Sequence, residues 1–186
     1  MRLVLVGPPG AGKGTQAEAL AEHFGVPHIS SGELLRRHVA SGTALGREVT
    51  GYLDRGELAP DDLVITVVDE ALAGAGSGYV LDGFPRTRSQ AEKADTRRGG
   101  ELADAVVFLD LPDDVARHRL AQRLAGRSDD RDRAVIERRL RTFHDETDPV
   151  VDYYRDRGKL VTVDAAQPPG AVTAAILAAL AGRRPG

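Results

Sequence analysis

A glycine-rich segment near the N-terminus combines residue types that bind phosphate. Residues 7–15 read Gly-Pro-Pro-Gly-Ala-Gly-Lys-Gly-Thr. Glycines let consecutive backbone N–H groups curl around phosphate oxygens, and the N-terminus of a following helix adds a favourable field. Lys13 can direct a full positive charge toward the β and γ phosphates of a nucleoside triphosphate, and Thr15 can place a hydroxyl beside magnesium. We therefore predict a triphosphate site formed by Gly10, Ala11, Gly12, Lys13, Gly14 and Thr15, in preference to a glycine-rich turn with a solvated lysine.

A second group of polar residues follows another apolar run. Residues 79–87 read Tyr-Val-Leu-Asp-Gly-Phe-Pro-Arg-Thr. Asp82 would stand at the carboxyl end of a strand, where a carboxylate can orient magnesium through its water ligands. Gly83 allows close backbone approach, Arg86 can fork onto a phosphate, and the Gln90 amide can read a base edge by donating and accepting together. A surface turn with an ion pair is the simpler interpretation, but α/β folds place ligands at this position.

Arginine is concentrated in the C-terminal half of a chain whose formal net charge is −3. Arg119, Arg123 and Arg127 recur at four-residue spacing, so a helix would place them on one face. Such a run usually forms a solvated face. It could instead clamp phosphates, because phosphoryl transfer depends on fixed positive groups around the equatorial oxygens.

Short apolar runs indicate the strands that must position these residues. Four runs, at 3–6, 79–81, 105–109 and 160–163, are continuous rather than alternating and rich in branched residues, and a weaker fifth lies at 26–29. Continuous runs are typical of strands buried on both faces of a parallel sheet.

Helical patterns separate the apolar runs. They cover 13–24, 63–72, a stretch from Pro112 to about Leu124, and 171–180. Strands that alternate with helices predict an α/β fold with a parallel sheet and helices on both faces, and ligands bind beyond the carboxyl ends of such strands. Both polar groups described above follow strands, as this fold requires.

The composition is that of an ordinary globular domain, with 186 residues, 41% hydrophobic and 28% charged. The chain has no cysteine, which excludes disulfides and thiolate zinc sites and fits a cytoplasmic protein. The net charge gives no overall attraction to nucleic acid or anionic membranes, and the apolar runs are too short for a signal peptide or a membrane span. We expect a soluble cytoplasmic protein without nucleic-acid or membrane partners.

One detail of the phosphate segment is more specific than the general pattern. The residue after Lys13 is Gly14 rather than Ser or Thr, and the hydroxyl comes one position later at Thr15. This Gly-Lys-Gly-Thr form, together with the Asp-Gly-Phe-Pro-Arg run that starts at Asp82 and the following Gln90, resembles adenylate kinase in its short bacterial form. The resemblance covers essentially the whole chain.

The resemblance implies a fold and a reaction. The fold would be a P-loop NTPase-type three-layer α/β/α domain over 1–186, with a five-stranded parallel sheet. A helical arm at about 30–59 would bind the nucleoside monophosphate, its residues 42–60 forming two short helices, and a short lid loop would lie at about 126–133. The reaction would be Mg·ATP + AMP ⇌ 2 ADP, carried out by a monomer that uses Mg²⁺ and no zinc.

The resemblance also assigns site residues. It places Ser31 and Arg36 on AMP, with Ser31 where Thr is commoner; read alone, residues 31–33 are also a plausible helix cap. Thr15 and Asp82 would hold magnesium, mainly through water. The full set of AMP contacts would be Ser31, Arg36, Glu57, Leu58, Ala59, Gly83, Phe84, Pro85, Arg86, Gln90, Arg127 and Arg139.

The remaining assignments concern ATP and catalysis. Arg119 would pack on the adenine of ATP, Arg123 would hold its phosphates, and the backbone near Gln167 would meet its base. Arg138 competes with Arg139 for the role of the second arginine that bridges AMP and the transferring group. The reason is that the spacing between Arg127 and Arg139 is one residue longer than the family pattern. The pair Asp129-Asp130 resembles acids near the magnesium, or caps a loop. Lys13, Arg86, Arg123, Arg127 and Arg139 would stabilise the transferring phosphoryl group.

Two other functions fit parts of the sequence. A UMP/CMP kinase of the same fold would share most of these residues and differ in its acceptor base. A nucleotide-dependent switch would use the phosphate segment alone, but it would leave a second phosphate site unexplained. The chain also has no Asn-Lys-x-Asp motif for reading guanine.

Overall fold

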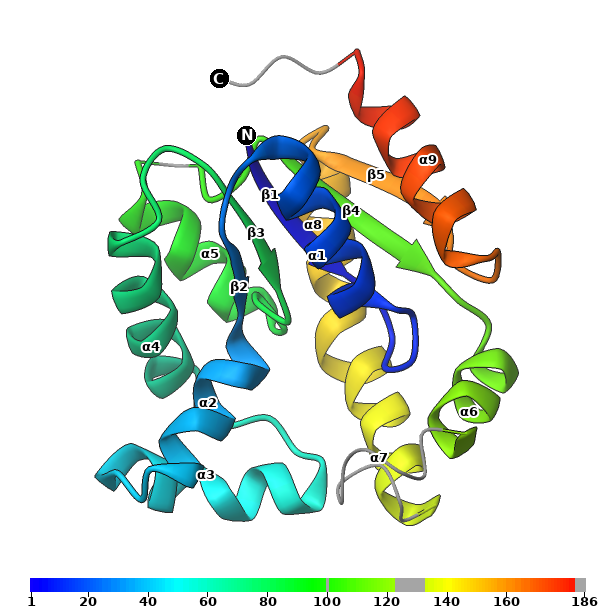
Figure 1. The fold of residues 1–186 in the computed structure, drawn as a ribbon. Coiled ribbons are helices and arrows are strands. Elements are labelled where there is room, and N and C mark those ends of the chain that lie inside the picture. The colour runs from blue at the N-terminus through cyan, green and yellow to red at the C-terminus, as the bar shows by residue number, and fades with distance from the viewer. Residues whose placement is uncertain (100, 123–132, 183–186) are drawn as a thin grey trace.

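The computed structural model describes residues 1–99, 101–122 and 133–182. Its centre is one parallel sheet of five strands in the order β2-β3-β1-β4-β5 (Figure 1). The strands are β1 (Arg2–Val6), β2 (His28–Ser30), β3 (Tyr79–Asp82), β4 (Ala105–Asp110) and β5 (Leu160–Asp164). All five predicted strands are therefore present. The weakest of them is a three-residue strand at the sheet edge that begins after Pro27.

The helices lie on both faces of the sheet, as the alternation of patterns predicts. They are α1 (Lys13–Phe24), α2 (Ser31–Ala40), α3 (Ala44–Arg55), α4 (Asp61–Ala73), α5 (Arg88–Arg97), α6 (Asp113–Gln122), α7 (Arg133–Thr142), α8 (Asp148–Asp156) and α9 (Pro169–Leu180). A π-helical segment, η2 (Phe143–Thr147), joins α7 to α8. No helix among the described residues is long and apolar enough to cross a membrane.

Two hydrophobic clusters flank the sheet because successive side chains of a strand point to opposite faces. In β1, Leu3 and Leu5 pack with α1 and α9 in one cluster. Val4 and Val6 pack with α4, α5 and α8 in the other. All four side chains are almost fully buried, which explains why the run in the sequence is continuous rather than alternating.

The arm differs from its prediction in one respect. Residues 42–60 contain one helix, α3, rather than two short ones. Gly42 and Gly56 adopt positive φ on either side of it, but Gly46 lies inside the helix. A Cβ at Gly46 would lie 2.0 Å from the backbone oxygen of His38 in α2. This glycine therefore permits the close approach of α2 and α3, and it does not divide residues 42–60 into two helices.

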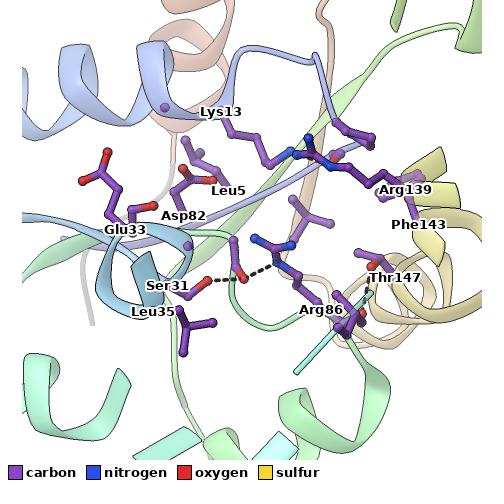
Figure 2. A pocket seen from close by; sticks show the side chains of 18 of the residues that line it. Leu5, Lys13, Ser31, Glu33, Leu35, Asp82, Arg86, Arg139, Phe143 and Thr147 are labelled. Atoms are coloured by element: carbon purple, nitrogen blue, oxygen red, sulfur yellow. Dashed lines mark hydrogen bonds between the residues drawn. The ribbon is translucent and has the colours of Figure 1, made fainter. Parts of the chain in front are cut away.

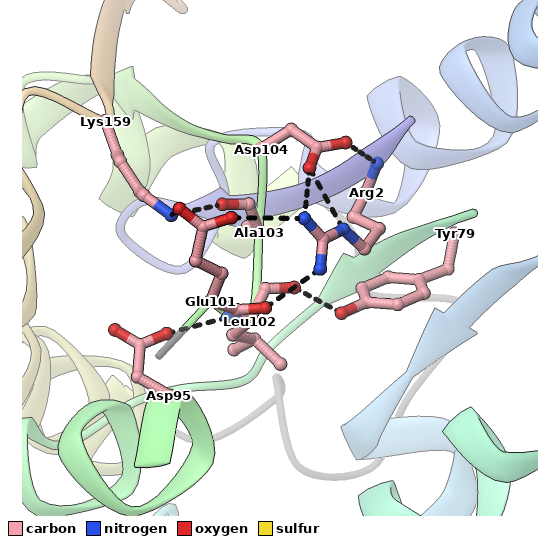
Figure 3. Close-up of polar contacts among 8 residues, drawn as sticks. All are labelled: Arg2, Tyr79, Asp95, Glu101, Leu102, Ala103, Asp104 and Lys159. Carbon is pink, nitrogen blue, oxygen red and sulfur yellow. Dashed lines mark hydrogen bonds and ion pairs between the residues drawn. The ribbon is translucent and has the colours of Figure 1, made fainter. Parts of the chain in front are cut away.

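The amino ends of the strands are held by a network of polar contacts (Figure 3). Arg2 donates to both carboxylate oxygens of Asp104, through its backbone N–H at 2.7 Å and its Nε at 2.9 Å. The Tyr79 hydroxyl donates to the carbonyl of Leu102, and Asp95 accepts from the Leu102 N–H at 2.8 Å. These contacts anchor the turn before β4 at the edge opposite the carboxyl ends of the strands.

His144 in η2 links two helices that are distant in sequence. Its Nε2 lies 3.0 Å from Asp113 at the start of α6, and its Nδ1 lies 3.0 Å from Asp148 at the start of α8. Hydrogen bonds to the two carboxylates raise the pKa of His144. The protonated imidazole can donate to both carboxylates at once, so this link is strongest when His144 is charged.

This link predicts a pH dependence of stability. The pKa of His144 is raised on folding, so its contribution is fully present below the ordinary value of about 6.5 and is lost as pH rises through the folded pKa. The side chain is half exposed, so we expect His144→Gln to lower the free energy of unfolding by at most about 1 kcal/mol near pH 6. Urea unfolding of both proteins from pH 6 to 9 should show this difference shrinking. A difference that is constant across the range would contradict the prediction.

Candidate active site

A cavity with a volume of about 600 Å³ opens at the carboxyl edge of the sheet. Most of its lining comes from three places: the loop between β1 and α1, the arm with the segment after β3, and helix α7 with η2 (Figure 2). The two polar groups that the sequence separates by about seventy residues therefore face one cavity. This is the edge at which parallel α/β sheets bind ligands.

The loop before α1 has the backbone form that phosphate binding needs. Gly10 and Gly12 adopt φ of +89° and +85°, a region that favours glycine, and helix α1 begins at Lys13. The Lys13 ammonium donates to the backbone oxygens of Gly7 and Pro8 at 2.8 and 2.9 Å, so its charge is held over the loop. The positive end of α1 and Lys13 thus act on the same space.

Asp82 ends β3 beside β1, where it pairs in register with Leu5. A Cβ added to Gly14 would lie 3.9 Å from Asp82 Oδ2, so the carboxylate lies against the first turn of α1. Thr15 and Glu33 line the same cavity. The described residues contain no group of three or more His, Cys, Asp or Glu side chains that could hold a metal. One carboxylate and one hydroxyl fit an ion such as Mg²⁺, which takes most of its ligands from water and phosphate.

The backbone oxygen of Gly83 links Ser31 of the arm to Arg86 in the segment after β3. It accepts from Ser31 Oγ at 2.6 Å and from Arg86 Nε at 2.7 Å (Figure 2). Gly83 has φ of +76°, and a Cβ there would lie 2.8 Å from Ser31 Oγ and 2.9 Å from Arg86 Nη2. Burial lowers the pKa of the Arg86 guanidinium, whereas the charge of Asp82 raises it. Only a glycine at position 83 allows the side chains of Ser31 and Arg86 to lie this close to the backbone.

Gln90 lies at the first turn of α5 with its side chain facing the cavity, and the residue is 1% exposed. Its Oε1 accepts from the backbone N–H of Arg86 at 2.7 Å. Its Nε2 donates to Asp61 Oδ1 at 2.8 Å. The amide oxygen is therefore held by a donor, and the amide nitrogen is held by an acceptor.

The arm touches α7 on the far side of the cavity. Arg138 pairs with Glu57 at 3.0 Å, and a Cβ at Gly56 would lie 2.9 Å from Cγ of Arg139. Arg139 lines the cavity, and Figure 2 shows its side chain directed toward Lys13. The two neighbouring arginines thus have different surroundings: Arg138 lies in the contact between arm and core, and Arg139 lies over the cavity.

Arg119 and Gln167 lie together beside this cavity rather than in its lining. Arg119 donates to the backbone oxygens of Ala165 and Ala166 at 2.9 and 3.1 Å. Gln167 donates to Asp164 at 2.9 Å within the same loop after β5. The backbone of this loop and the planar guanidinium of Arg119 thus lie side by side. A nucleotide base can pack against such a pair of surfaces.

Sequence comparisons identify the family. An adenylate kinase family model matches residues 5–159. The chain belongs to the adenylate kinase family. Adenylate kinase 1 of a Nostoc species is 47% identical over 183 residues, covering 96% of this chain and 98% of the relative. Adenylate kinase of a Synechococcus species is 45% identical, with coverage of 97% and 98%, and that of Stenotrophomonas maltophilia is 43% identical, with coverage of 98% and 100%.

Membership of the adenylate kinase family makes this protein a phosphotransferase, and its sheet agrees with the fold that the sequence predicted. The cavity brings together most of the predicted residues: Gly10, Gly12, Lys13, Gly14, Thr15, Ser31, Arg36, Glu57, Leu58, Ala59, Asp82, Gly83, Pro85, Arg86, Gln90 and Arg139.

Four predicted residues do not line the cavity. Ala11 and Phe84 are buried in the two hydrophobic clusters, so any contact with a nucleotide would come from their backbone. Arg119 and Gln167 lie beside it, as described above. Arg123, Arg127, Asp129 and Asp130 lie outside the described residues, as does the predicted lid loop except for Arg133.

Three residues in or beside the cavity were not expected from the sequence. Glu33 lines the cavity, although an acid in the first turn of a helix usually serves only the helix dipole. Thr147, in the π-helical segment η2, donates to the backbone oxygen of Arg86 with a distance of 2.8 Å. No local sequence pattern predicts this π-helical segment. Asp61 holds Gln90 from a helix start 29 residues away. In the sequence, all three look like ordinary residues at the ends of helices, so the sequence alone does not distinguish them.

The close packing at Gly83 gives a prediction for this family member. Gly83→Ala should lower turnover by about 10²-fold, because a Cβ would displace the Ser31 and Arg86 side chains from their positions in the cavity. The matched control is Gly76→Ala, since Gly76 also has positive φ, +67°, but has no atom within 4 Å of the added Cβ.

Backbone strain should lower the free energy of unfolding of both variants by about 1–2 kcal/mol. Only Gly83→Ala should also show the lower turnover. Steady-state turnover and thermal unfolding of the two purified proteins test this. Equal turnover in the two variants would show that the contact with Ser31 and Arg86 is unimportant.

Proposed function

We propose that the protein transfers the γ-phosphoryl group of Mg·ATP to AMP and produces two molecules of ADP. The observation that supports this most directly is the composition of the cavity. Lys13 and the helix α1 N-terminus lie at one end, and Ser31, Arg36, Arg86 and Gln90 lie at the other. One continuous space with two phosphate-binding ends suits a donor and an acceptor that react with each other.

The chemistry needs little from the protein except position and charge. An oxygen of the AMP phosphate attacks the γ phosphorus as the bond from that phosphorus to the ADP oxygen breaks. The acceptor oxygen is already ionised, so no general base is required. Lys13, Arg86 and Arg139 would stabilise the charge spread over the transferring group, together with Arg123 and Arg127. When bound, Mg²⁺ would neutralise charge on the phosphate oxygens, with Thr15 and Asp82 holding its shell.

The contact pattern supports one resolution of the two neighbouring arginines. Arg138 is engaged with Glu57 of the arm, whereas Arg139 extends over the cavity toward Lys13. We assign the role in catalysis to Arg139 and a role in arm contact to Arg138. We also extend the proposal to a monomer located in the cytoplasm.

A coupled assay with ATP and each nucleoside monophosphate tests the proposed function. AMP should be the preferred acceptor, because Gln90 presents a donor and an acceptor to a base edge. Preference for UMP or CMP would instead assign the protein to the related pyrimidine kinases. Binding of ATP without transfer to any monophosphate would favour a nucleotide-dependent switch.

The assignment of Arg139 gives a second test. Arg139→Ala should lower kcat by about 10³-fold, the range for removal of a charge that stabilises the transferring group. Arg138→Ala is the matched control, because it removes the same charge one residue away. The Arg138–Glu57 pair is partly exposed and worth less than about 1 kcal/mol, so kcat should change less than about five-fold.

Purified variants should be compared for kcat and for the KM of AMP. A loss of kcat in Arg138→Ala as large as that in Arg139→Ala would overturn this assignment. Both variants should retain the melting temperature of the wild type to within a few degrees, because neither side chain lies in the hydrophobic core.

A further inference from the structure

Asp61 does not line the cavity, but its carboxylate accepts a hydrogen bond from Gln90, which does. We propose that Asp61 is a positioning residue that fixes the orientation of the Gln90 amide, and that it thereby makes the acceptor site discriminate adenine from 6-oxopurines. The inference rests on the proposed function, in which Gln90 faces the base of the acceptor monophosphate. It concerns which purine is accepted.

The chemical problem is that an amide side chain has two nearly equivalent orientations. Adenine presents an amino donor at C6 beside the N1 acceptor. Guanine and hypoxanthine present an oxygen acceptor at C6 beside an N1–H donor. A primary amide can match either edge, because rotation by about 180° exchanges its donor and its acceptor. A glutamine that rotates between them would therefore accept both kinds of purine, and selectivity requires that one orientation be fixed.

The structure holds the amide from both ends. The backbone N–H of Arg86 can only donate, and it points to Oε1 at 2.7 Å. The carboxylate of Asp61 can only accept, and it receives Nε2 at 2.8 Å. A rotated amide would place its oxygen against a carboxylate and its N–H₂ against an N–H. Gln90 is 1% exposed, so water could not replace the two lost hydrogen bonds.

Asp61 is itself held in place. The Thr87 hydroxyl lies 3.1 Å from each of its two carboxylate oxygens, and the same hydroxyl accepts from the backbone N–H of Gln90 at 3.1 Å. Thr87 therefore connects the start of α4 to the start of α5. Each amide end still has one hydrogen-bonding position left, the second hydrogen of Nε2 and the second lone pair of Oε1, and these can face the base.

The chain supplies a matched control in the next residue. Asp62 also lies in the first turn of α4, but it is exposed and pairs with Lys93 at 2.9 Å on the surface. Asp61→Asn and Asp62→Asn remove the same charge from the same helix end. Only the first replaces a pure acceptor next to Gln90 by an amide that can also donate to a rotated Gln90.

The experiment measures kcat/KM for AMP and for IMP, the 6-oxopurine monophosphate that lacks a 2-amino group. The ratio of the two constants is independent of the fraction of folded enzyme, so a partly unfolded variant still gives a result. We expect Asp61→Asn to lower the AMP-to-IMP ratio by about ten-fold, the effect of one charge-assisted hydrogen bond. Asp62→Asn should leave the ratio unchanged.

Two further variants test the route of the effect. Thr87→Val keeps the side-chain shape and removes the hydroxyl that holds Asp61, and it should lower the ratio in the same direction by a smaller factor. In a Gln90→Ala background, Asp61→Asn should have no effect on the ratio, because the amide through which it acts is absent. An effect that persists without Gln90 would overturn the inference.

An unchanged ratio in Asp61→Asn, with AMP still the preferred acceptor of the wild type, would also overturn the inference and leave the proposed function intact. Failure of the wild type to phosphorylate AMP would overturn the proposed function itself. The two failures are therefore distinguishable within one set of assays.

Discussion

The arrangement of Ser31 and Arg86 in the cavity depends on the backbone oxygen of Gly83. This oxygen receives hydrogen bonds from Ser31 at the start of α2 and from the Arg86 side chain, so it ties the arm to the central sheet. The positive φ of Gly83 and the lack of a Cβ make both contacts possible at once. Gly83 directly follows β3, and β3 pairs with β1 in the sheet. The position of the Gly83 oxygen is therefore fixed relative to the phosphate loop that follows β1.

A parallel sheet explains why residues distant in sequence form one site. Strands β1 and β3 are neighbours in space although about seventy residues separate them, so the loops that follow them meet at the same edge. The phosphate loop contributes Lys13, the end of β3 and the segment after it contribute Asp82 and Arg86, and α7 adds Arg139 from the opposite wall. Positive charge from three parts of the chain therefore gathers around one cavity, which is the arrangement that phosphoryl transfer requires.

The sequence predicted well those features that local chemistry determines. Four continuous apolar runs and one weaker run located the five strands, and the phosphate loop and the run beginning at Asp82 were recognisable from residue type and spacing alone. Contacts across the fold could not be predicted in this way. Gly46 resembles a helix end but permits the crossing of α2 and α3, and Asp61 resembles a helix-terminal acid but holds Gln90. Local patterns carry no information about which neighbour the fold will bring to a residue.

The two edges of the sheet differ in how their charges are used. At the carboxyl edge, lysine and arginine side chains surround a cavity. At the amino edge, Arg2 is matched by Asp104 and Glu101, and Tyr79 and Asp95 hold the turn before β4. The length of the strands separates the two edges, so substitutions at the amino edge act on the unfolding equilibrium and leave the reacting groups in place. Thermal adaptation and substrate choice can therefore change independently in this scaffold, each by mutation of its own end of the same strands.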